Sequence, residues 1–188
     1  AYDFPKGEYT VEDYFALPED DRKELIDGVF YDMATPSTAH QLILGELYIQ
    51  FVQCIRDSGK NCHVILAPFG VQLDKDNRTM VEPDLIVTCE ETLRSKCFFG
   101  APDLTIEILS PSTRKKDMSL KLHKYRDAGV REYWIVDPKA RQIMVYDLSD
   151  YIFPQIFSFE DDVPVIISKG SCHINISAVI PVLDSIIS

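Results

Sequence analysis

The sequence predicts an α/β (α+β) fold in which a central mixed β-sheet is flanked by helices. Two long segments with helical spacing alternate with several short apolar runs that have the spacing of strands. Hydrophobic residues make up 46% of the chain and charged residues 26%, as in ordinary globular proteins. The 188 residues fit a single domain, because no repeat, low-complexity tract or linker divides them.

The N-terminal part is expected to form a short helix followed by a hairpin. Thr10 and Asp13 have the spacing of a capping box, which predicts a helix over residues 11–17. The pair Asp27-Gly28 lies between two runs that contain apolar residues, which predicts a two-residue hairpin within residues 24–33.

A long helix should follow, with Ser37 as its N-cap and Gly59 at its C-terminal end. From residue 63 the spacing changes to that of strands. These are expected over residues 64–66, 71–73, 85–88, 104–109, 132–136 and 142–148. A second long helix is predicted from Arg114 to Ala128. The C-terminal part should hold further short strands and a helical turn near Val179.

The net charge of −11 is unfavourable for a protein that binds nucleic acid, since a basic surface gives most of the affinity for phosphate. The charge is unevenly distributed, however. Residues 112–126 carry six basic side chains and one acidic side chain, for a local charge of +5. Phosphate binding is expected there, and the alternative is a solvated helix face.

The five cysteines are odd in number, and none has the spacing of a zinc site. We therefore expect reduced thiols in a cytoplasmic protein. A membrane span is excluded because no apolar stretch of about 18 residues exists. The first twenty residues lack a basic region followed by an apolar run, so we expect no signal peptide.

Two carboxylates are candidates for metal chemistry because of their positions. Asp84 follows Pro83 at the start of one predicted strand, and Glu107 lies inside the next apolar strand. A carboxylate among apolar residues is costly unless it is paired, protonated or bound to a cation. If the two strands are neighbours, both carboxylates can reach one point. Two oxygen ligands completed by waters suit Mg²⁺ or Mn²⁺ rather than zinc.

Lys121 is expected on the second long helix, on the same face as Asp117 and Tyr125. Beside a phosphodiester, a lysine can orient the attacking water, help to deprotonate it or stabilise the developing charge. Each candidate also has a simpler interpretation. Asp84 could only shape a turn, Glu107 could lie on an exposed strand face, and Lys121 could only pair with Asp117. We interpret Tyr125 as a core aromatic residue.

Longer segments carry a resemblance to a known family. They are ELIDGVFYDM (24–33), Ser37 with His40, PDLIV (83–87), PDLTIEILSPST (102–113), DMSLKLHKY (117–125) and GVREYWIVDP (129–138). Together they resemble the Uma-two family of restriction-endonuclease-like proteins, assigned to the PD-(D/E)XK superfamily. The likeness covers roughly residues 10–146, and 102–138 is its most specific part.

The resemblance implies a role for each residue at a matching position. Asp84 and Glu107 match the acidic residues of the family pattern, and the metal-binding set it implies is Asp84, Glu107 and Ile108. The standard pattern has a lysine two residues after the glutamate, where this chain has Leu109. The lysine role therefore passes to Lys121 on the following helix.

Glu24 and His40 match two further positions of the family. Glu24 resembles an additional acid that binds a second ion or a water, and His40 could donate to phosphate or to a carboxylate. A packed histidine near a helix start is the alternative for His40. Asp103 imitates a second Pro-Asp pair, but roughly 13 Å of extended strand separates it from Glu107, so we assign it to the strand entry.

The function implied is Mg²⁺- or Mn²⁺-dependent hydrolysis of DNA phosphodiester bonds, with Asp84 and Glu107 binding the ion and Lys121 assisting the attacking water. The alternatives are a binding module for nucleic acid or protein that has lost turnover, and an enzyme that acts on another phosphate ester. By analogy with the fold, a homodimer is expected. The residues define no substrate sequence.

Overall fold

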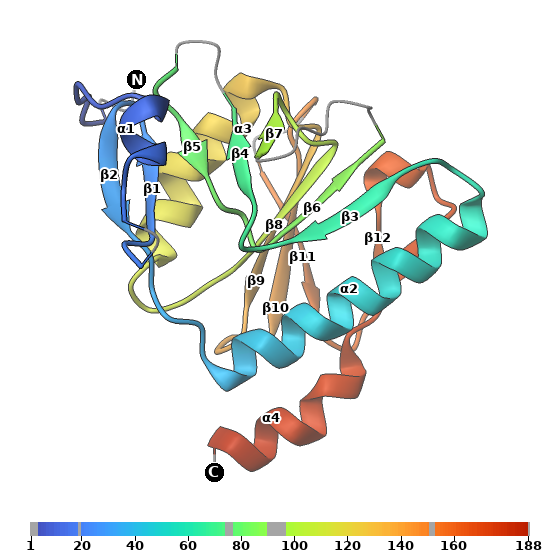
Figure 1. The fold of residues 1–188 in the computed structure, drawn as a ribbon. Helices are drawn as coiled ribbons and strands as arrows, with labels where there is room; N and C mark the ends of the chain where they lie inside the picture. The colour runs from blue at the N-terminus through green and yellow to red at the C-terminus, as the bar shows by residue number, and fades with distance from the viewer. Residues whose placement is uncertain (1–3, 19, 74–76, 90–96, 151–152, 188) are drawn as a thin grey trace.

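The computed structural model describes residues 4–18, 20–73, 77–89, 97–150 and 153–187 (Figure 1). Its helical elements are α1 (Val11–Phe15), α2 (Thr38–Ser58), the π-helical η1 (Lys116–Lys121), α3 (Leu122–Ala128), the short 3-10 helices η2 (Ile166–Ser168) and η3 (Ser177–Val179), and α4 (Ile180–Ile187). Its strands are β1 (Lys23–Ile26), β2 (Val29–Asp32), β3 (His63–Leu66), β4 (Gly70–Gln72), β5 (Met80–Val81), β6 (Leu85–Thr88), β7 (Cys97–Phe99), β8 (Leu104–Ile108), β9 (Glu132–Asp137), β10 (Gln142–Asp147), β11 (Gln155–Ser158), β12 (Val163–Pro164) and β13 (His173–Ile174).

The largest sheet has six strands in the order β11-β10-β9-β8-β6-β3. Its β8–β9 pair is parallel and its other pairs are antiparallel, so the sheet is mixed, as predicted. A second sheet has the order β2-β1-β5-β4-β7, and β12 and β13 form a small third sheet. The predicted α+β class with a mixed central sheet is therefore confirmed.

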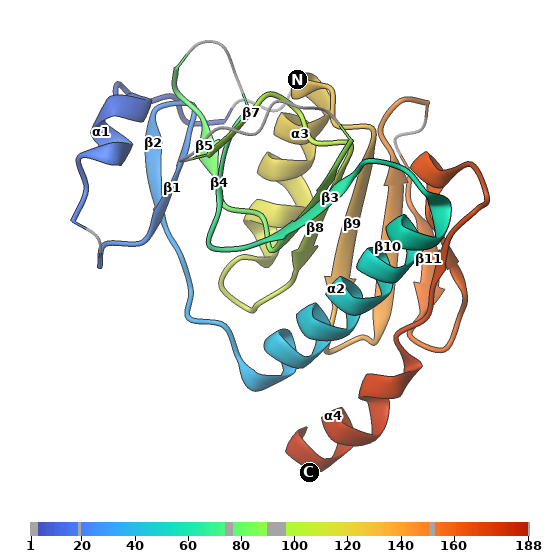
Figure 2. The same cartoon turned by 45° about the vertical axis from the view of Figure 1, so that its right-hand side comes forward.

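The six-stranded sheet separates two apolar cores. Alternate side chains of β8 and β9, among them Ile106 and Trp134, pack against α2 residues such as Leu47 and Phe51. The intervening side chains, such as Tyr133 and Ile135, face the other way and pack with the helix that follows β8. In Figures 1 and 2, α2 crosses one face of the sheet and α3 covers the other. Period-two burial thus assigns each strand residue to one of two layers.

The predicted local signals are present at the N-terminal elements. Thr10 and Asp13 form the capping box of α1, which ends at Phe15, slightly earlier than predicted. Asp27 and Gly28 both have positive φ and connect β1 to β2. The hydroxyl of Ser37 accepts a hydrogen bond from the backbone N–H at the start of α2.

Two features differ from the sequence prediction. Strands β5 and β7 were not predicted, because each has only two or three residues and too little alternation to show a period. The predicted regular helix over 114–128 contains the π-helical turn η1 before α3 begins. Such turns are often found at functional sites.

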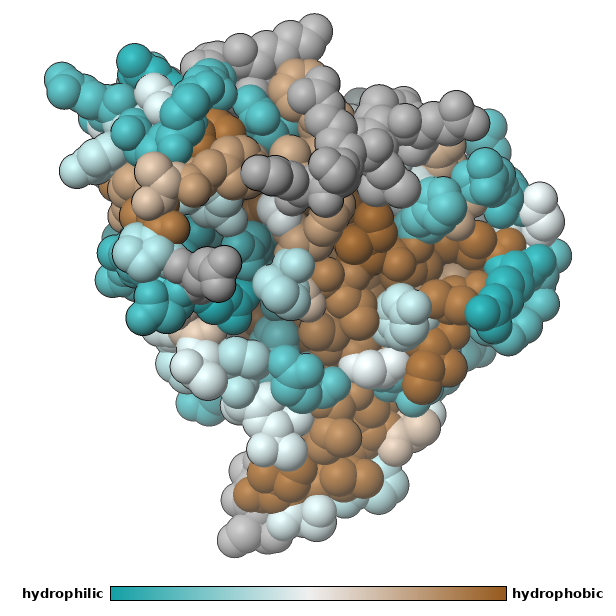
Figure 3. Space-filling model, viewed as in Figure 1, coloured by the Kyte–Doolittle hydropathy of each residue, from teal (hydrophilic) through white to brown (hydrophobic). Residues whose placement is uncertain are grey.

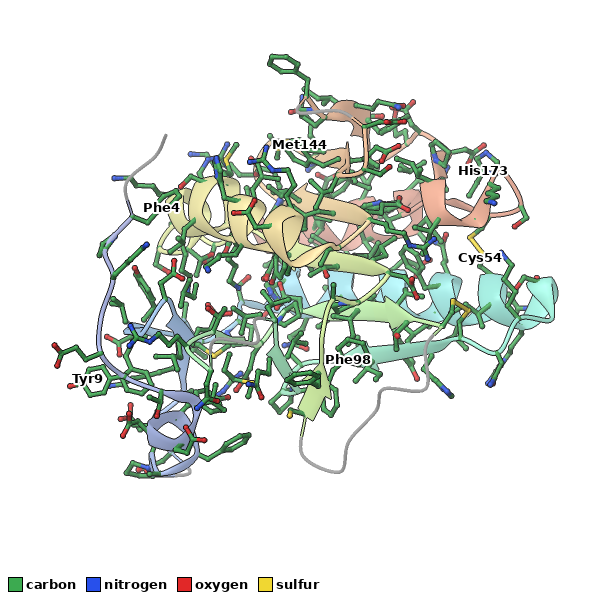
Figure 4. All side chains as sticks on the ribbon, turned by 90° about the horizontal axis from the view of Figure 1, so that it is seen from above. Phe4, Tyr9, Cys54, Phe98, Met144 and His173 are labelled. Carbon is green, nitrogen blue, oxygen red and sulfur yellow. A yellow bond between two sulfur atoms is a disulfide. The ribbon has the colours of Figure 1, made fainter. Side chains whose placement is uncertain are left out.

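The prediction that the cysteines are reduced is wrong for four of them. Cys54 is bonded to Cys172 and Cys62 to Cys89, whereas Cys97 is free and buried. Figure 4 shows the yellow sulfur–sulfur bond beside the label of Cys54. The partners are 118 and 27 residues apart, and only tertiary packing brings them together. Spacing along the chain therefore gave no sign of either bond.

Several apolar side chains remain at the surface. Hydrophobic residues gather over α2 and α4 on the face seen in Figure 3. Ile49 of α2 and Val182 of α4 are among the exposed large hydrophobic residues of the protein. Within the described residues, neither α2 nor any other helix combines the length and apolar character that a membrane crossing requires.

Candidate functional site

A cleft of about 1090 Å³ opens between the two large sheets and the start of α2. Its walls come from β1, β8, the residues just before β6, the segment before α2 and the helical turn η1. Every residue that the sequence singled out for the site contributes to its lining. These residues are Glu24, His40, Asp84, Glu107, Ile108 and Lys121.

The two candidate metal-binding carboxylates belong to neighbouring segments, with Asp84 directly before β6 and Glu107 within β8. In the antiparallel β6–β8 pair, Leu85 is opposite Ile106, and continuing this register places Asp84 opposite Glu107. Residues directly opposite have Cβ atoms about 4.5–5.5 Å apart and share a sheet face. The Oδ2 atom of Asp84 accepts the backbone N–H of Ile108 at 2.7 Å, which fixes this carboxylate against β8. The structure thus brings both groups to one end of the cleft.

The ammonium group of Lys121 lies between two carboxylates that are far apart in the chain. Its Nζ is 2.7 Å from Oε1 of Glu107 and 2.6 Å from Oε1 of Glu24. Asp117, one helical turn away, is more distant, at 3.7 Å. The simple interpretation of Lys121 as a partner of Asp117 alone is therefore wrong.

The side chain of Glu24 is buried, although this residue lies near the start of the hairpin strand β1. Its first oxygen, Oε1, contacts Lys121, and its second oxygen, Oε2, is 2.6 Å from Nζ of Lys116. Its Oε1 also accepts the backbone N–H of Glu82 at 3.1 Å. Glu24 consequently connects the five-stranded sheet to the helix that carries Lys121.

His40 lies in the first turn of α2, beside the start of β6. Its Nε2 is 3.0 Å from Oδ1 of Asp84, while its Nδ1 is buried and has no hydrogen-bond partner among the described residues. Of the two partners considered for His40, the structure shows a carboxylate. Asp84 therefore has one oxygen on His40 and the other on Ile108.

Two residues of this cluster were not predicted from the sequence. Tyr125 is buried, as expected for a core residue, but its hydroxyl donates to Oε1 of Glu107 at 2.6 Å. Lys116, at the start of η1, donates to Glu24 on β1. The sequence placed Tyr125 on the same helix face as Lys121, but its bond to Glu107 depends on how the helix packs against the sheet. Lys116 gave no such signal.

Burial raises the pKa of the Glu107 carboxyl well above its ordinary value. The ammonium group of Lys121 opposes this effect, whereas the nearby carboxylates of Asp117, Asp84 and Glu24 add to it. An additional cation nearby would therefore favour the ionised form of Glu107.

Burial also acts on Lys121 and lowers its pKa, but the carboxylates of Glu107, Glu24 and Asp117 outweigh it. The pKa of Lys121 consequently lies well above its ordinary value. For Glu24, burial raises the pKa, and the ammonium groups of Lys121 and Lys116 lower it by more. The Lys121–Glu24 contact is thus an ion pair at neutral pH.

The residues of the cleft fit a hard divalent cation. Four carboxylates, those of Glu24, Asp84, Glu107 and Asp117, face two ammonium groups, which gives a formal charge of −2 when all are ionised. Oδ1 of Asp117 is buried and has no hydrogen-bond partner among the described residues. The part of the chain that the structure describes holds no group of three or more His, Cys, Asp or Glu side chains that could bind a metal ion. Mg²⁺ commonly binds to one or two carboxylates and keeps several waters, so a pair suffices.

Asp103 lies outside the cleft. Its Oδ2 accepts the backbone N–H of Cys89 at 2.6 Å, and its Oδ1 pairs with Arg131. These contacts fix the entry to β8, at the opposite end of the strand from Glu107. The two Pro-Asp pairs of the sequence thus have different surroundings.

Comparisons with known proteins agree with this fold. Residues 11–170 match the family model Uma2, described as "Putative restriction endonuclease". The uncharacterized protein slr1290 of Synechocystis sp. (strain ATCC 27184 / PCC 6803 / Kazusa) is 31% identical over 152 residues, covering 78% of this chain and 77% of that protein.

A solved structure has the same fold. It is the crystal structure of "a putative nuclease belonging to DUF820" from Anabaena variabilis ATCC 29413. Its TM-score is 0.76 at 22% sequence identity, over 94% of this chain and 99% of that chain. The likeness shows that the two proteins share a fold through nearly the whole of this chain.

Proposed function

The chain belongs to the Uma2 family, and on that premise we propose that it is a metal-dependent endonuclease that hydrolyses DNA phosphodiester bonds. The observation that carries the proposal is the convergence of Asp84, Glu107 and Lys121 in one cleft. These residues come from three separate elements, and the contacts of Glu24 and His40 extend the same network.

In this proposal, Asp84, Glu107 and the backbone carbonyl of Ile108 hold Mg²⁺ or Mn²⁺. The carbonyl is assigned because Ile108 has no side-chain oxygen and its N–H is already bonded to Asp84. When bound, such an ion would neutralise charge on the scissile phosphate and lower the pKa of a water. Asp84 directly precedes β6 and Glu107 lies within the neighbouring strand β8, and both side chains line the cleft.

Lys121 is proposed to act as a charged donor to the attacking water and the reacting phosphate. The three carboxylates around it keep it protonated, which supports donation over proton removal. Glu24 contacts it from the five-stranded sheet, and Lys116 on η1 holds the other oxygen of Glu24. The basic segment that contains Lys115 and Lys116 lies beside the cleft and is the proposed contact for the DNA backbone.

Cleavage of supercoiled plasmid DNA tests the proposal. The purified protein should nick or linearise the plasmid with Mg²⁺ or Mn²⁺, and chelation with EDTA should abolish this activity. Asp84→Asn should lower the rate at least 100-fold, because it removes the charge and keeps the side-chain size.

Asp103→Asn is the matched control, since Asp103 also follows a proline at a strand entry but lies outside the cleft. It should cut at a rate within about threefold of the unmodified protein, as expected for a position remote from the chemistry. Equal rates for the Asp84 and Asp103 variants would refute the assignment of Asp84.

A binding module without turnover is the second candidate, and the net charge of −11 favours it. The basic groups of the cleft also have acidic partners, as in the pairs Arg22–Glu82 and Arg114–Asp137. Such a module could retain the fold and lose ion binding. Calorimetric titration with Mg²⁺ separates the two, because an intact site should bind the ion and Asp84→Asn should abolish the binding.

The oligomeric state and the cellular location of the protein stay predictions. A homodimer is expected by analogy with nucleases of this fold that cut two strands, and light scattering on the purified protein tests it. A cytoplasmic location is expected from the sequence analysis. Cell fractionation tests that location, and the four bonded cysteines make the result informative.

A further inference from the structure

Two side chains of one helical segment donate to the same oxygen of Glu107. Lys121 Nζ lies 2.7 Å from Oε1, and the Tyr125 hydroxyl lies 2.6 Å from the same atom. No described residue donates to the second oxygen, Oε2. The carboxylate therefore has one oxygen anchored toward the helix and one available on the side of the cleft that Glu107 lines.

Tyr125 is the more rigid of these two donors. Its ring is completely buried and lies 4.9 Å from the ring of Tyr133, centroid to centroid, within the apolar core beneath η1 and α3. A buried tyrosine has few accessible rotamers, whereas a lysine has a long flexible side chain. Lys121 is also shared among three carboxylates. Its position consequently depends on their charges, and that of Tyr125 does not.

We propose that Tyr125 is a positioning residue that fixes the rotamer of Glu107, so that Oε2 is presented to a divalent cation beside Asp84. This inference rests on the proposed function and adds a residue that acts through Glu107 without touching the ion. Outer residues that orient metal ligands commonly change metal affinity by about 10–100-fold when they are replaced. The hydroxyl of Tyr125 should have an effect in that range.

Tyr133 supplies a matched control. It is equally buried, packs against Tyr125, and also makes one hydrogen bond, from its hydroxyl to the backbone carbonyl of Asp117 at 3.1 Å. Tyr125→Phe and Tyr133→Phe each remove one buried oxygen atom and one hydrogen bond. A purely structural role would make the two variants alike, whereas the positioning role separates them.

The test is calorimetric titration of Mn²⁺ into the unmodified protein, Tyr125→Phe and Tyr133→Phe. We expect the Kd for Mn²⁺ to rise about 10-fold or more for Tyr125→Phe and to stay within about twofold for Tyr133→Phe. The Mn²⁺ concentration for half-maximal plasmid cleavage should shift in the same way, with the rate at saturating Mn²⁺ changed less. The rise in Tm that Mn²⁺ causes gives a second measure of affinity and confirms that each variant is folded.

Equal Kd values for the two variants, or an unchanged Kd for Tyr125→Phe, would overturn the inference and leave the proposed function intact. If the unmodified protein binds no Mn²⁺, the proposed metal site fails and the inference fails with it. If Mn²⁺ binds and Asp84→Asn does not weaken it, the ion lies elsewhere, and both claims are again wrong. The three results are distinguishable within one set of titrations.

Discussion

At the scale of single residues, the cleft depends on one buried ammonium group. Lys121 is 3% exposed and is surrounded by Glu24, Glu107 and Asp117. Removing one partner from a buried ionic cluster leaves the others without compensation, which costs more than the cluster contributes as a whole. Substitutions of Lys121 therefore affect folding as well as chemistry, and Asp84, which is partly exposed, is the better position for testing activity.

Lys121→Ala should lower the free energy of unfolding by about 3–5 kcal/mol, since it leaves three carboxylates buried together. Adding Glu107→Gln to this variant should restore part of the loss, because one of those charges is then absent. Urea unfolding at pH 7 measures both effects. An additive decrease in the double variant would show that the two residues are not coupled.

A second effect at this scale concerns Asp137, at the end of β9. Burial raises its pKa, but the Arg114 guanidinium and the backbone N–H groups of Ala140 and Lys139 lower it by more. A carboxyl whose pKa is lower when folded contributes stability above its unfolded pKa of about 3.9. That contribution is lost as the pH falls through the folded pKa.

The difference in the free energy of unfolding between the unmodified protein and Asp137→Asn should therefore be constant from about pH 5 to about pH 7. It should shrink below roughly pH 4. Urea unfolding of both proteins across this range is the measurement. A difference that grows on acidification would contradict the assigned direction of the pKa shift.

At the scale of elements, the start of α2 sets the position of His40. The Ser37 hydroxyl accepts the backbone N–H of His40 at 3.2 Å and so caps the helix one turn from the Asp84 contact. The cap is a local feature that the sequence alone predicted. The pairing of His40 with Asp84, in contrast, depends on how α2 crosses the sheet.

Ser37→Ala should lower the free energy of unfolding by about 1 kcal/mol, the usual cost of losing an N-cap. Ser37→Asn should preserve most of the stability, because its side-chain oxygen can accept the same N–H. Thermal unfolding of the three proteins compares them directly. Equal losses in both variants would mean that the hydroxyl acts through packing and not as a cap.

The sequence predicted elements better than it predicted contacts. Capping signals, the Asp27-Gly28 turn and the apolar runs identified most helices and strands, because each depends on neighbouring residues. The sequence predicted that Asp84 and Glu107 lie close together only on the condition that their two strands are neighbours. In the structure β6 and β8 are paired. The Tyr125–Glu107 bond could not be predicted, since it depends on the depth of the helix against the sheet.

At the scale of the whole molecule, two disulfides join segments that lie far apart in the sequence. Cys54–Cys172 connects α2 to the C-terminal part, and Cys62–Cys89 connects the ends of the paired strands β3 and β6. Pairing over such distances is invisible to residue spacing. Both bonds lie outside the residues that line the cleft, so they should affect stability more than ion binding.

Reduction with dithiothreitol should lower the free energy of unfolding, by about 4 kcal/mol for the Cys54–Cys172 bond, because its loop is long. Cys54→Ala should show the part of this loss that belongs to the Cys54–Cys172 bond without reductant, and the further loss on adding reductant should then come from the Cys62–Cys89 bond alone. Urea unfolding with and without dithiothreitol measures the effect, and mass spectrometry under non-reducing conditions identifies the bonded pairs. A protein whose stability is unchanged by reductant would contradict the expected contribution.

The central claim is that Asp84 and Glu107 share a divalent cation beside Lys121. Anomalous X-ray scattering from crystals grown with Mn²⁺ tests it most directly. The predicted result is one strong peak at about 2.2 Å from an oxygen of each carboxylate, with Oε2 as the Glu107 ligand and the Lys121 ammonium retained nearby. A cleft without a peak at saturating Mn²⁺, or a peak that neither carboxylate contacts, would contradict the claim.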